Sequence, residues 1–189
     1  MDSIVLMGIK HCGKSSQARI LGAQLGLDIY DTDSVIEDCT GKTPRGIYSA
    51  EGENAFKVAE VHACEVIREK IASSGKKAAI ATGGGICNNP DAVEILKKIG
   101  TLVFLRTDEE TAVQRIVREI TMNPDGTMSN LPAYIAKKNP ATVNDVKKIF
   151  HAFFVERTEL YKKIADVTVR ISNAPKKVNT NAIRKALGI

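Results

Sequence analysis

The stretch "GIKHCGKSS" occupies Gly8–Ser16 and directly follows the apolar run "SIVLM" at residues 3–7. Its spacing is G-x-x-x-x-G-K-S. Between a buried strand and a helix, such a loop turns backbone N–H groups toward phosphate, and the helix adds its positive N-terminus. Lys14 would bring a positive charge to the β- and γ-phosphates, and the Ser15 hydroxyl would ligate Mg²⁺. The loop therefore predicts a site for a nucleoside triphosphate.

We expect the whole loop to surround the phosphates. The expected nucleotide-binding residues of this loop are Gly8, Ile9, Lys10, His11, Cys12, Gly13, Lys14, Ser15 and Ser16. Residues 9–12 are unusual for such a loop, and we expect His11 to be exposed and passive. The alternative is a glycine-rich turn capped by serine, which the strand before the loop and the helix after it disfavour.

The composition is that of an ordinary soluble domain. The chain has 189 residues, 43% of them hydrophobic and 26% charged, with a net charge of +5. That charge suits an enzyme with anionic ligands, whereas dispersed lysines and few aromatic residues argue against nucleic acid as a partner. No apolar run reaches the roughly 18 residues of a membrane span, so we expect no membrane partner and a cytoplasmic location. The four scattered cysteines are expected to be reduced structural thiols, without metal-ligand spacing.

Strand-like and helix-like segments alternate along the chain. Strands are predicted at residues 3–7, 28–33, 78–85, 101–106 and 166–172, and helices at 15–25, 52–72, 91–99, 108–120 and 178–187. This alternation predicts parallel βαβ units, and hence an α/β fold with a five-stranded parallel sheet and helices on both faces. Residues 121–144 are rich in Pro, Asn and Gly, which predicts a long irregular segment, either a mobile functional loop or a disordered excursion.

Two further signals follow predicted strands. Asp31 and Asp33 end the second strand, and the triple glycine of "TGGG" (residues 82–85) follows the third. A period of two places both carboxylates on one face, where one can hold a Mg²⁺-bound water and the other can accept a hydroxyl proton. Taken alone, the aspartates could cap a helix starting at Ser34, and the glycines could form a flexible turn. Ligands bind at the carboxyl ends of parallel strands, so the three signals together predict one crevice.

These residues give the chain a resemblance to the shikimate kinase family. The stretches that carry it are "GIKHCGKSS", "DTD", "TPRGIYSAEGENAFKVAE", "ATGGG" and "ERTELYKKIADVTV". The resemblance implies a single P-loop kinase domain over 1–189, like that of the nucleoside monophosphate kinases, with a substrate-binding helical region at about 34–60 and a mobile lid at about 119–150. It implies transfer of the γ-phosphate of Mg-ATP to the 3-hydroxyl of shikimate, and we expect a monomer.

The same resemblance assigns roles to individual residues. Lys14 would contact the transferring phosphate, Ser15 and Asp31 would serve Mg²⁺, and Asp33 would bind substrate hydroxyls and act as the base. The other expected substrate-binding residues are Lys57, Gly83, Gly84, Gly85 and Arg157. Beyond the phosphate loop, the expected ATP-binding residues are Arg115, at the position that stacks on adenine, and Pro175, in the loop at residues 172–177 that edges the purine.

The chain departs from the family pattern at two positions. Lys57 follows "GENAF" where the family has an arginine that grips the substrate carboxylate, and a lysine lacks the planar fork of a guanidinium. Lys57 could be held by Glu60 through an i,i+3 pair, or it could simply be a solvated residue on the helix face. In the lid, Leu131 of "SNLPAY" stands where the family has an arginine that closes on the γ-phosphate. Either Lys137 or Lys138 replaces that arginine, or turnover is slow, or the substrate differs.

Two other functions remain open at this point. The protein could be a kinase for a related polyhydroxy acid, because "DTD" with "GGG" suits any ligand that presents a hydroxyl to Asp33. It could also be a nucleotide-binding protein with little catalysis, which the missing lid arginine makes possible. The complete set of Lys14, Ser15, Asp31 and Asp33 argues against the second alternative.

Overall fold

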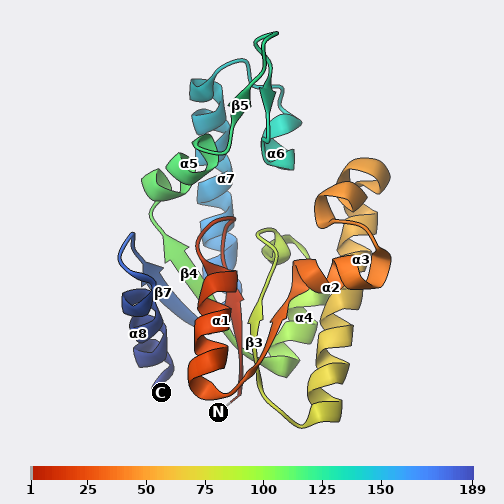
Figure 1. Cartoon of the computed structure of the whole chain (residues 1–189), viewed down its shortest axis with the longest axis vertical. Helices are drawn as coiled ribbons and strands as arrows, with labels where there is room; N and C mark the ends of the chain where they lie inside the picture. Colours follow the sequence, from red (N-terminus) through yellow and green to blue (C-terminus); the bar gives the residue numbers. More distant parts are fainter. Residues whose placement is uncertain (1) are drawn as a thin grey trace.

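Five parallel strands form the central sheet of the computed structural model, which describes residues 2–189 (Figure 1). In sheet order they are β2 (Asp28–Asp31), β3 (Ala78–Ala81), β1 (Ser3–Met7), β4 (Gly100–Thr107) and β7 (Val167–Ile171). Each neighbouring pair is parallel. The predicted α/β class and five-stranded parallel sheet are confirmed.

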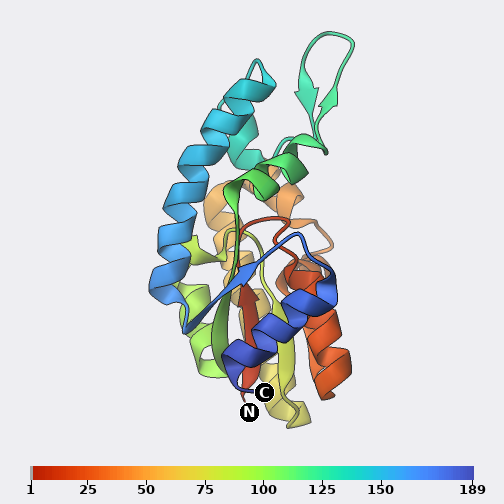
Figure 2. The same cartoon turned by 90° about the vertical axis from the view of Figure 1, so that its left-hand side faces the viewer.

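Helices cover both faces of the sheet because its central strands are mostly apolar and buried. Every residue of β1 and of β3 is buried, the pattern of a strand that is covered on both sides. One face is covered by α1 (Lys14–Leu25) and α8 (Lys176–Leu187). The other is covered by α4 (Pro90–Ile99) and α7 (Val143–Ile164), with α3 (Pro44–Ser74) packed on α4 (Figure 2).

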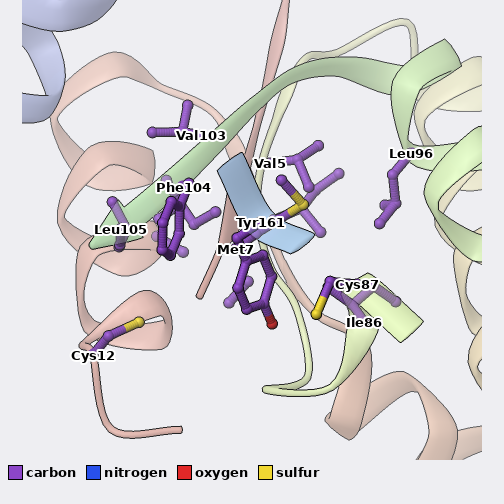
Figure 3. Close-up of a cluster of buried hydrophobic side chains, with 14 of the residues drawn as sticks. Val5, Met7, Cys12, Ile86, Cys87, Leu96, Val103, Phe104, Leu105 and Tyr161 are labelled. Atoms are coloured by element: carbon purple, nitrogen blue, oxygen red, sulfur yellow. The ribbon is translucent and has the colours of Figure 1, made fainter. Parts of the chain in front are cut away.

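The core reaches from α7 to the phosphate loop. Tyr161 on α7 is fully buried and stacks on Phe104 of β4, with ring centroids 5.0 Å apart (Figure 3). Its hydroxyl donates a hydrogen bond to the carbonyl of Gly8 at 3.2 Å. Burial raises the pKa of the Tyr161 hydroxyl well above its ordinary value, so the group stays neutral and keeps its proton for this bond. The first glycine of the loop is thereby fixed to the core.

Smaller elements stand at the carboxyl ends of the strands, on two sides of the sheet (Figure 1). On one side lie α2 (Thr32–Thr40) and the first turns of α3, which Gly52 separates from the rest of the helix with a φ of 89°. A 3₁₀ turn, η1 (Ile86–Asn88), follows the triple glycine. The other side holds the group of elements α5 (Glu109–Val117), β5 (Thr121–Met122), β6 (Met128–Ser129) and α6 (Ala133–Ala136).

Several predicted boundaries differ from the structure. The strands predicted to run to residues 33 and 85 end at Asp31 and Ala81, and Asp33 lies in the first turn of α2 rather than on a strand. The prediction that residues 121–144 are irregular was wrong in part, because they contain the antiparallel pair β5–β6 and the helix α6.

The sequence analysis predicted no helix at α7, although a capping box at its start was readable. Thr142 and Asp145 exchange side chain to backbone hydrogen bonds there, as such boxes do. Within residues 2–189 we find no helix that combines the length and the apolar character needed to cross a membrane.

Candidate nucleotide and acceptor site

The phosphate loop has the backbone conformation that its glycines allow. Gly8 and Gly13 have φ values of 147° and 96°, which side chains with a Cβ rarely adopt. A Cβ on Gly8 would lie 2.8 Å from the sulfur of Cys12 and 2.8 Å from the carbonyl oxygen of Leu105, so no larger residue fits. At Gly8 the loop therefore packs tightly against its own residue Cys12 and against β4. Its last residues lead directly into the N-terminus of α1.

Lys14 is buried inside this loop, with 8% of its surface exposed. Its Nζ donates to the carbonyl oxygens of Gly8 and Ile9, at 2.9 Å each. The Cys12 sulfur lies 3.9 Å from Nζ and is its third acceptor. The two carbonyl acceptors are neutral, and within residues 2–189 none of the ion pairs joins Lys14 to a carboxylate. A phosphate group would supply the missing negative charge.

Ser15 and Asp31 lie together, as the metal-site prediction requires. The Ser15 hydroxyl donates to Asp31 Oδ2 at 2.6 Å, while Asp31 Oδ1 accepts from the backbone N–H of Asp33 at 3.1 Å. Asp31 is also the N-cap of α2, so the helix-cap alternative is confirmed, with the helix starting at Thr32 rather than at Ser34. A hydroxyl and a carboxylate are oxygen ligands that suit Mg²⁺, which binds through few protein groups and completes its shell with water and substrate phosphates. No cluster of three or more potential His, Cys, Asp or Glu ligands occurs in residues 2–189.

A cavity of about 740 Å³ lies beside the loop. Five lysines and arginines line it against three carboxylates, an excess of positive charge that suits a polyphosphate. Arg115 reaches across it, donating to the carbonyl of His11 at 2.6 Å and to Asn173 Oδ1 at 3.3 Å. The predicted loop, Arg115 and the segment at residues 172–177 therefore surround one space.

Not every predicted ATP-binding residue lines that space. The predicted residues that line it are Lys10, His11, Cys12, Gly13, Lys14, Ser15, Ser16 and Arg115. Gly8 and Ile9, at the start of the loop, are buried and do not line the cavity. Pro175 does not line it either; it is the N-cap of α8, between the lining residues Ala174 and Lys176. His11, which was expected to be exposed, is only 23% exposed and has its Nε2 3.1 Å from Glu119 Oε2, although not aligned for a hydrogen bond.

The triple glycine joins the carboxylate pair through close backbone contacts. The N–H of Gly83 donates to Thr32 Oγ1 at 2.9 Å, a bond that the sequence analysis did not anticipate. A Cβ on Gly83 would lie 2.9 Å from Asp33 Oδ1, and a Cβ on Gly84 would lie 2.9 Å from the backbone nitrogen of Lys10. The glycines thus let the ends of β2 and β3 approach the phosphate loop.

Glu60 is a site residue whose environment sequence reasoning missed. Only 1% of it is exposed, and its Oε2 accepts from Asn89 Nδ2 at 3.1 Å. Its Oε1 has no partner and lies 3.3 Å from the position of a Cβ on Gly83. Burial raises the pKa of Glu60 to about 7, against a smaller opposing effect of the Asn89 hydrogen bond. Burial, followed by the charge of Asp31, also raises the pKa of Asp33. Two carboxyl groups therefore face the glycines with an increased tendency to hold protons.

The two predicted carboxylate-binding residues are placed differently. Arg157 Nη1 donates to the carbonyl of Gly85 at 2.9 Å and to Cys87 Sγ at 3.3 Å, so it lies at the triple glycine. The Lys57 ammonium lies 3.0 Å from Glu53 Oε1, one turn earlier on α3. Lys57 thus pairs with Glu53 and not with Glu60, the partner considered from the sequence, because the Glu60 carboxylate points into the protein toward Asn89.

Leu131, at the position of the missing arginine, and the two lysines considered as its replacement lie outside the cavity beside the phosphate loop. Leu131 is buried, and its carbonyl accepts from Arg45 Nη2 at 2.8 Å. The Lys137 ammonium lies 4.3 Å from the ring centroid of Tyr48 and donates to its hydroxyl. Lys138 is exposed.

Comparison with known proteins gives the same family over almost the entire chain. The shikimate kinase family model matches residues 10–187. Shikimate kinase of Actinobacillus succinogenes is 30% identical over 96% of this chain and 92% of its own length. Shikimate kinase 1 of Citrobacter koseri is 31% identical over 96% and 93%.

Solved structures show the same fold. Shikimate kinase of Acinetobacter baumannii, solved in complex with shikimate, is 26% identical with a TM-score of 0.72, over 100% of this chain and 94% of that one. Shikimate kinase of Bacteroides thetaiotaomicron has a TM-score of 0.79 at 18% identity, over 100% and 99%, and supports the fold alone. The phosphate loop, the strand-end carboxylates and these matches together show that this chain belongs to the shikimate kinase family and is a small-molecule kinase.

Proposed function

We propose that this protein transfers the γ-phosphate of ATP to the 3-hydroxyl of shikimate, with Mg²⁺ as its metal. The observation that carries the proposal is the contact between the two halves of the site. Gly84 abuts the phosphate loop at Lys10, while its neighbour Gly83 abuts Asp33. A hydroxyl held at Asp33 therefore lies next to a phosphate held by the loop, as direct transfer requires.

The transfer breaks one bond and forms one. The acceptor hydroxyl oxygen attacks the γ-phosphorus, the bond from that phosphorus to the β–γ bridging oxygen breaks, and ADP leaves with the bond's electrons. The hydroxyl proton passes to the Asp33 carboxylate, whose raised pKa makes it a stronger base than an exposed aspartate. Lys14 stabilises the charge on the phosphate oxygens. Mg²⁺, when held near Ser15 and Asp31, adds positive charge to the phosphates.

Acceptor recognition rests on the groups around the triple glycine. Arg157, already at Gly85, is in reach of a carboxylate beside the glycines and can give it two parallel hydrogen bonds. Lys57 would break its ion pair with Glu53 and contribute a second positive charge to the carboxylate site. We further propose that residues 34–60, which include α2 and the first part of α3, form the substrate-binding region. In the same way, residues 119–150 would form a lid that excludes water.

A related polyhydroxy acid is the second candidate acceptor. The specific observation in its favour is that Lys57 is paired with Glu53, so the carboxylate site has one arginine and one lysine already engaged with an acid. An acceptor whose carboxylate contacts a single cation would need only Arg157 to bind it.

The test measures ATP turnover with and without shikimate. Release of ADP and mass spectrometry of the acceptor are the two readouts. We expect ADP to appear with shikimate and to equal the shikimate 3-phosphate formed. Shikimate that lacks the 3-hydroxyl is the matched control and should give no product. Turnover with another hydroxy acid but not with shikimate would assign the second candidate, and the absence of turnover with any acceptor would contradict the kinase mechanism proposed.

A further inference from the structure

Lys10 stands at the junction of the phosphate loop and the acceptor side of the site. Its backbone nitrogen lies 2.9 Å, and its Cα 3.3 Å, from the position that a Cβ on Gly84 would take. Lys10 also lines the cavity beside the phosphate loop, together with Lys14, Asp31 and Asp33. The residue therefore borders both the space for the phosphates and the side of the site where the acceptor hydroxyl would lie.

The Lys10 ammonium is held loosely, in a way that lets it move. It lies 3.6 Å from Glu119 Oε2, and 52% of its side chain is exposed. An exposed ion pair of this length contributes little to stability, so a phosphate group can compete for the lysine. Glu119 lies between α5 and β5. The Lys10 ammonium is therefore held at the edge of the cavity, on the side of α5 and the β5–β6 pair.

A second cation is needed at the transferring group, and the lid does not provide one. Phosphoryl transfer spreads negative charge over three equatorial oxygens, and a positive side chain placed there accelerates it by ~10³-fold or more. Leu131 has no charge, and Lys137 lies against Tyr48, outside the cavity. Arg118 is the competing residue, since it also lines the cavity. Lys10, however, belongs to the phosphate loop itself and abuts Gly84 of the triple glycine, whereas Arg118 follows α5.

We propose that Lys10 is a catalytic residue that leaves Glu119 and binds a non-bridging oxygen of the γ-phosphoryl group while that group passes to the acceptor. This rests on the proposed kinase function and names a further residue of the same site. Lys10 takes no proton and forms no bond in the step. Its ammonium donates a hydrogen bond to the oxygen that gains negative charge as the bond to ADP breaks and the bond to the acceptor forms.

The first test compares Lys10→Met with Lys10→Arg, Arg118→Met and the control Lys76→Met in shikimate-dependent turnover; Lys76 is an exposed lysine between α3 and β3. We expect Lys10→Met to lower kcat by ~10²-fold or more while KM for ATP changes by roughly threefold or less. Lys10→Arg should retain most of the activity, and Lys76→Met should match the wild type. If Lys10→Met keeps kcat within about twofold, or if Arg118→Met alone lowers kcat, the proposal is wrong.

The second test needs no acceptor and separates this proposal from the function. The probe is ADP with Mg²⁺ and aluminium fluoride, which imitates the planar transferring group, and its affinity is compared with that of ADP and Mg²⁺ alone by calorimetry. We expect Lys10→Met to weaken binding of the fluoride complex by at least about tenfold, with ADP alone unchanged. Equal affinities in wild type and variant would overturn the role of Lys10, even if shikimate were phosphorylated. If the wild type does not phosphorylate shikimate but Lys10→Met still weakens binding of the fluoride complex, only the assignment of shikimate as the acceptor is overturned.

Discussion

Replacing Glu60 by Gln should remove a pH dependence from the stability of this protein. The Glu60 carboxyl is buried, accepts one hydrogen bond from Asn89, and has its second oxygen without a partner. A glutamine has the same shape and can still accept from Asn89 through its own carbonyl oxygen. The substitution therefore removes the ionisation while it keeps the packing.

The magnitude follows from the change in pKa. Burial raises the pKa of Glu60 from 4.5 to about 7, and each pH unit corresponds to about 1.4 kcal/mol. Between pH 4.5 and 7 the unfolded chain releases this proton while the folded chain keeps it, so the free energy of unfolding falls as the pH rises. The contribution is fully present below pH 4.5 and is lost by about pH 7. The total loss is about 3 kcal/mol.

Urea denaturation at a series of pH values from 4.5 to 8 measures this effect. The wild type should lose about 3 kcal/mol more than Glu60→Gln over that range. Glu69→Gln, which changes an exposed glutamate on the same helix, is the matched control and should keep the wild-type pH dependence. Parallel curves for wild type and Glu60→Gln would refute the reasoning, because the buried carboxyl would then ionise as it does in the unfolded chain.

Three further predictions concern the proposed reaction. Lys14→Ala should abolish turnover because it removes the buried charge beside the phosphates; near-native activity would mean that the loop is assigned wrongly, and a thermal melt checks the fold. Asp33→Asn should lower phosphoryl transfer by ~10²-fold or more and leave ATP affinity intact, which kcat and nucleotide titration measure; loss of ATP binding with turnover retained would assign Asp33 to the nucleotide. Lys57→Arg should tighten shikimate binding by about 1 kcal/mol, and Arg157→Ala should weaken it more than Lys57→Ala. KM for shikimate tests this pair, with KM for ATP as control, and the opposite order would place the carboxylate elsewhere.

The phosphate loop and the five parallel strands were predictable because they depend on local properties of the chain. The spacing of Gly8, Gly13 and Lys14 determines a loop conformation within a few residues, where positive φ angles require glycine. Fully apolar runs such as that of β1 predict strands covered on both faces. Carboxyl ends of parallel strands meet at one edge, so the convergence of Asp31, Asp33 and the triple glycine also followed.

Boundaries and partners were harder to predict where two local arrangements compete. "DTD" is compatible with a strand that continues or with a helix that starts, and the structure starts α2 at Thr32 with Asp31 as its cap. Lys57 has an acid at each of two helical spacings, Glu53 and Glu60. It pairs with Glu53, because Glu60 is drawn into the protein by Asn89, from a segment 29 residues away.

The sequence by itself determined the phosphate loop, the parallel sheet and the edge of the sheet where ligands meet, because backbone geometry and apolar periodicity act over short stretches of chain. Only the tertiary structure decided which side chains meet at that edge. It brought Gly83 to Thr32, placed Lys10 against Gly84 and within 3.6 Å of Glu119, and held Lys137 over Tyr48. Each of these contacts joins two residues that are 51 to 109 positions apart in the sequence. They depend on how the helices pack on the sheet, and no local pattern of residues specifies that packing.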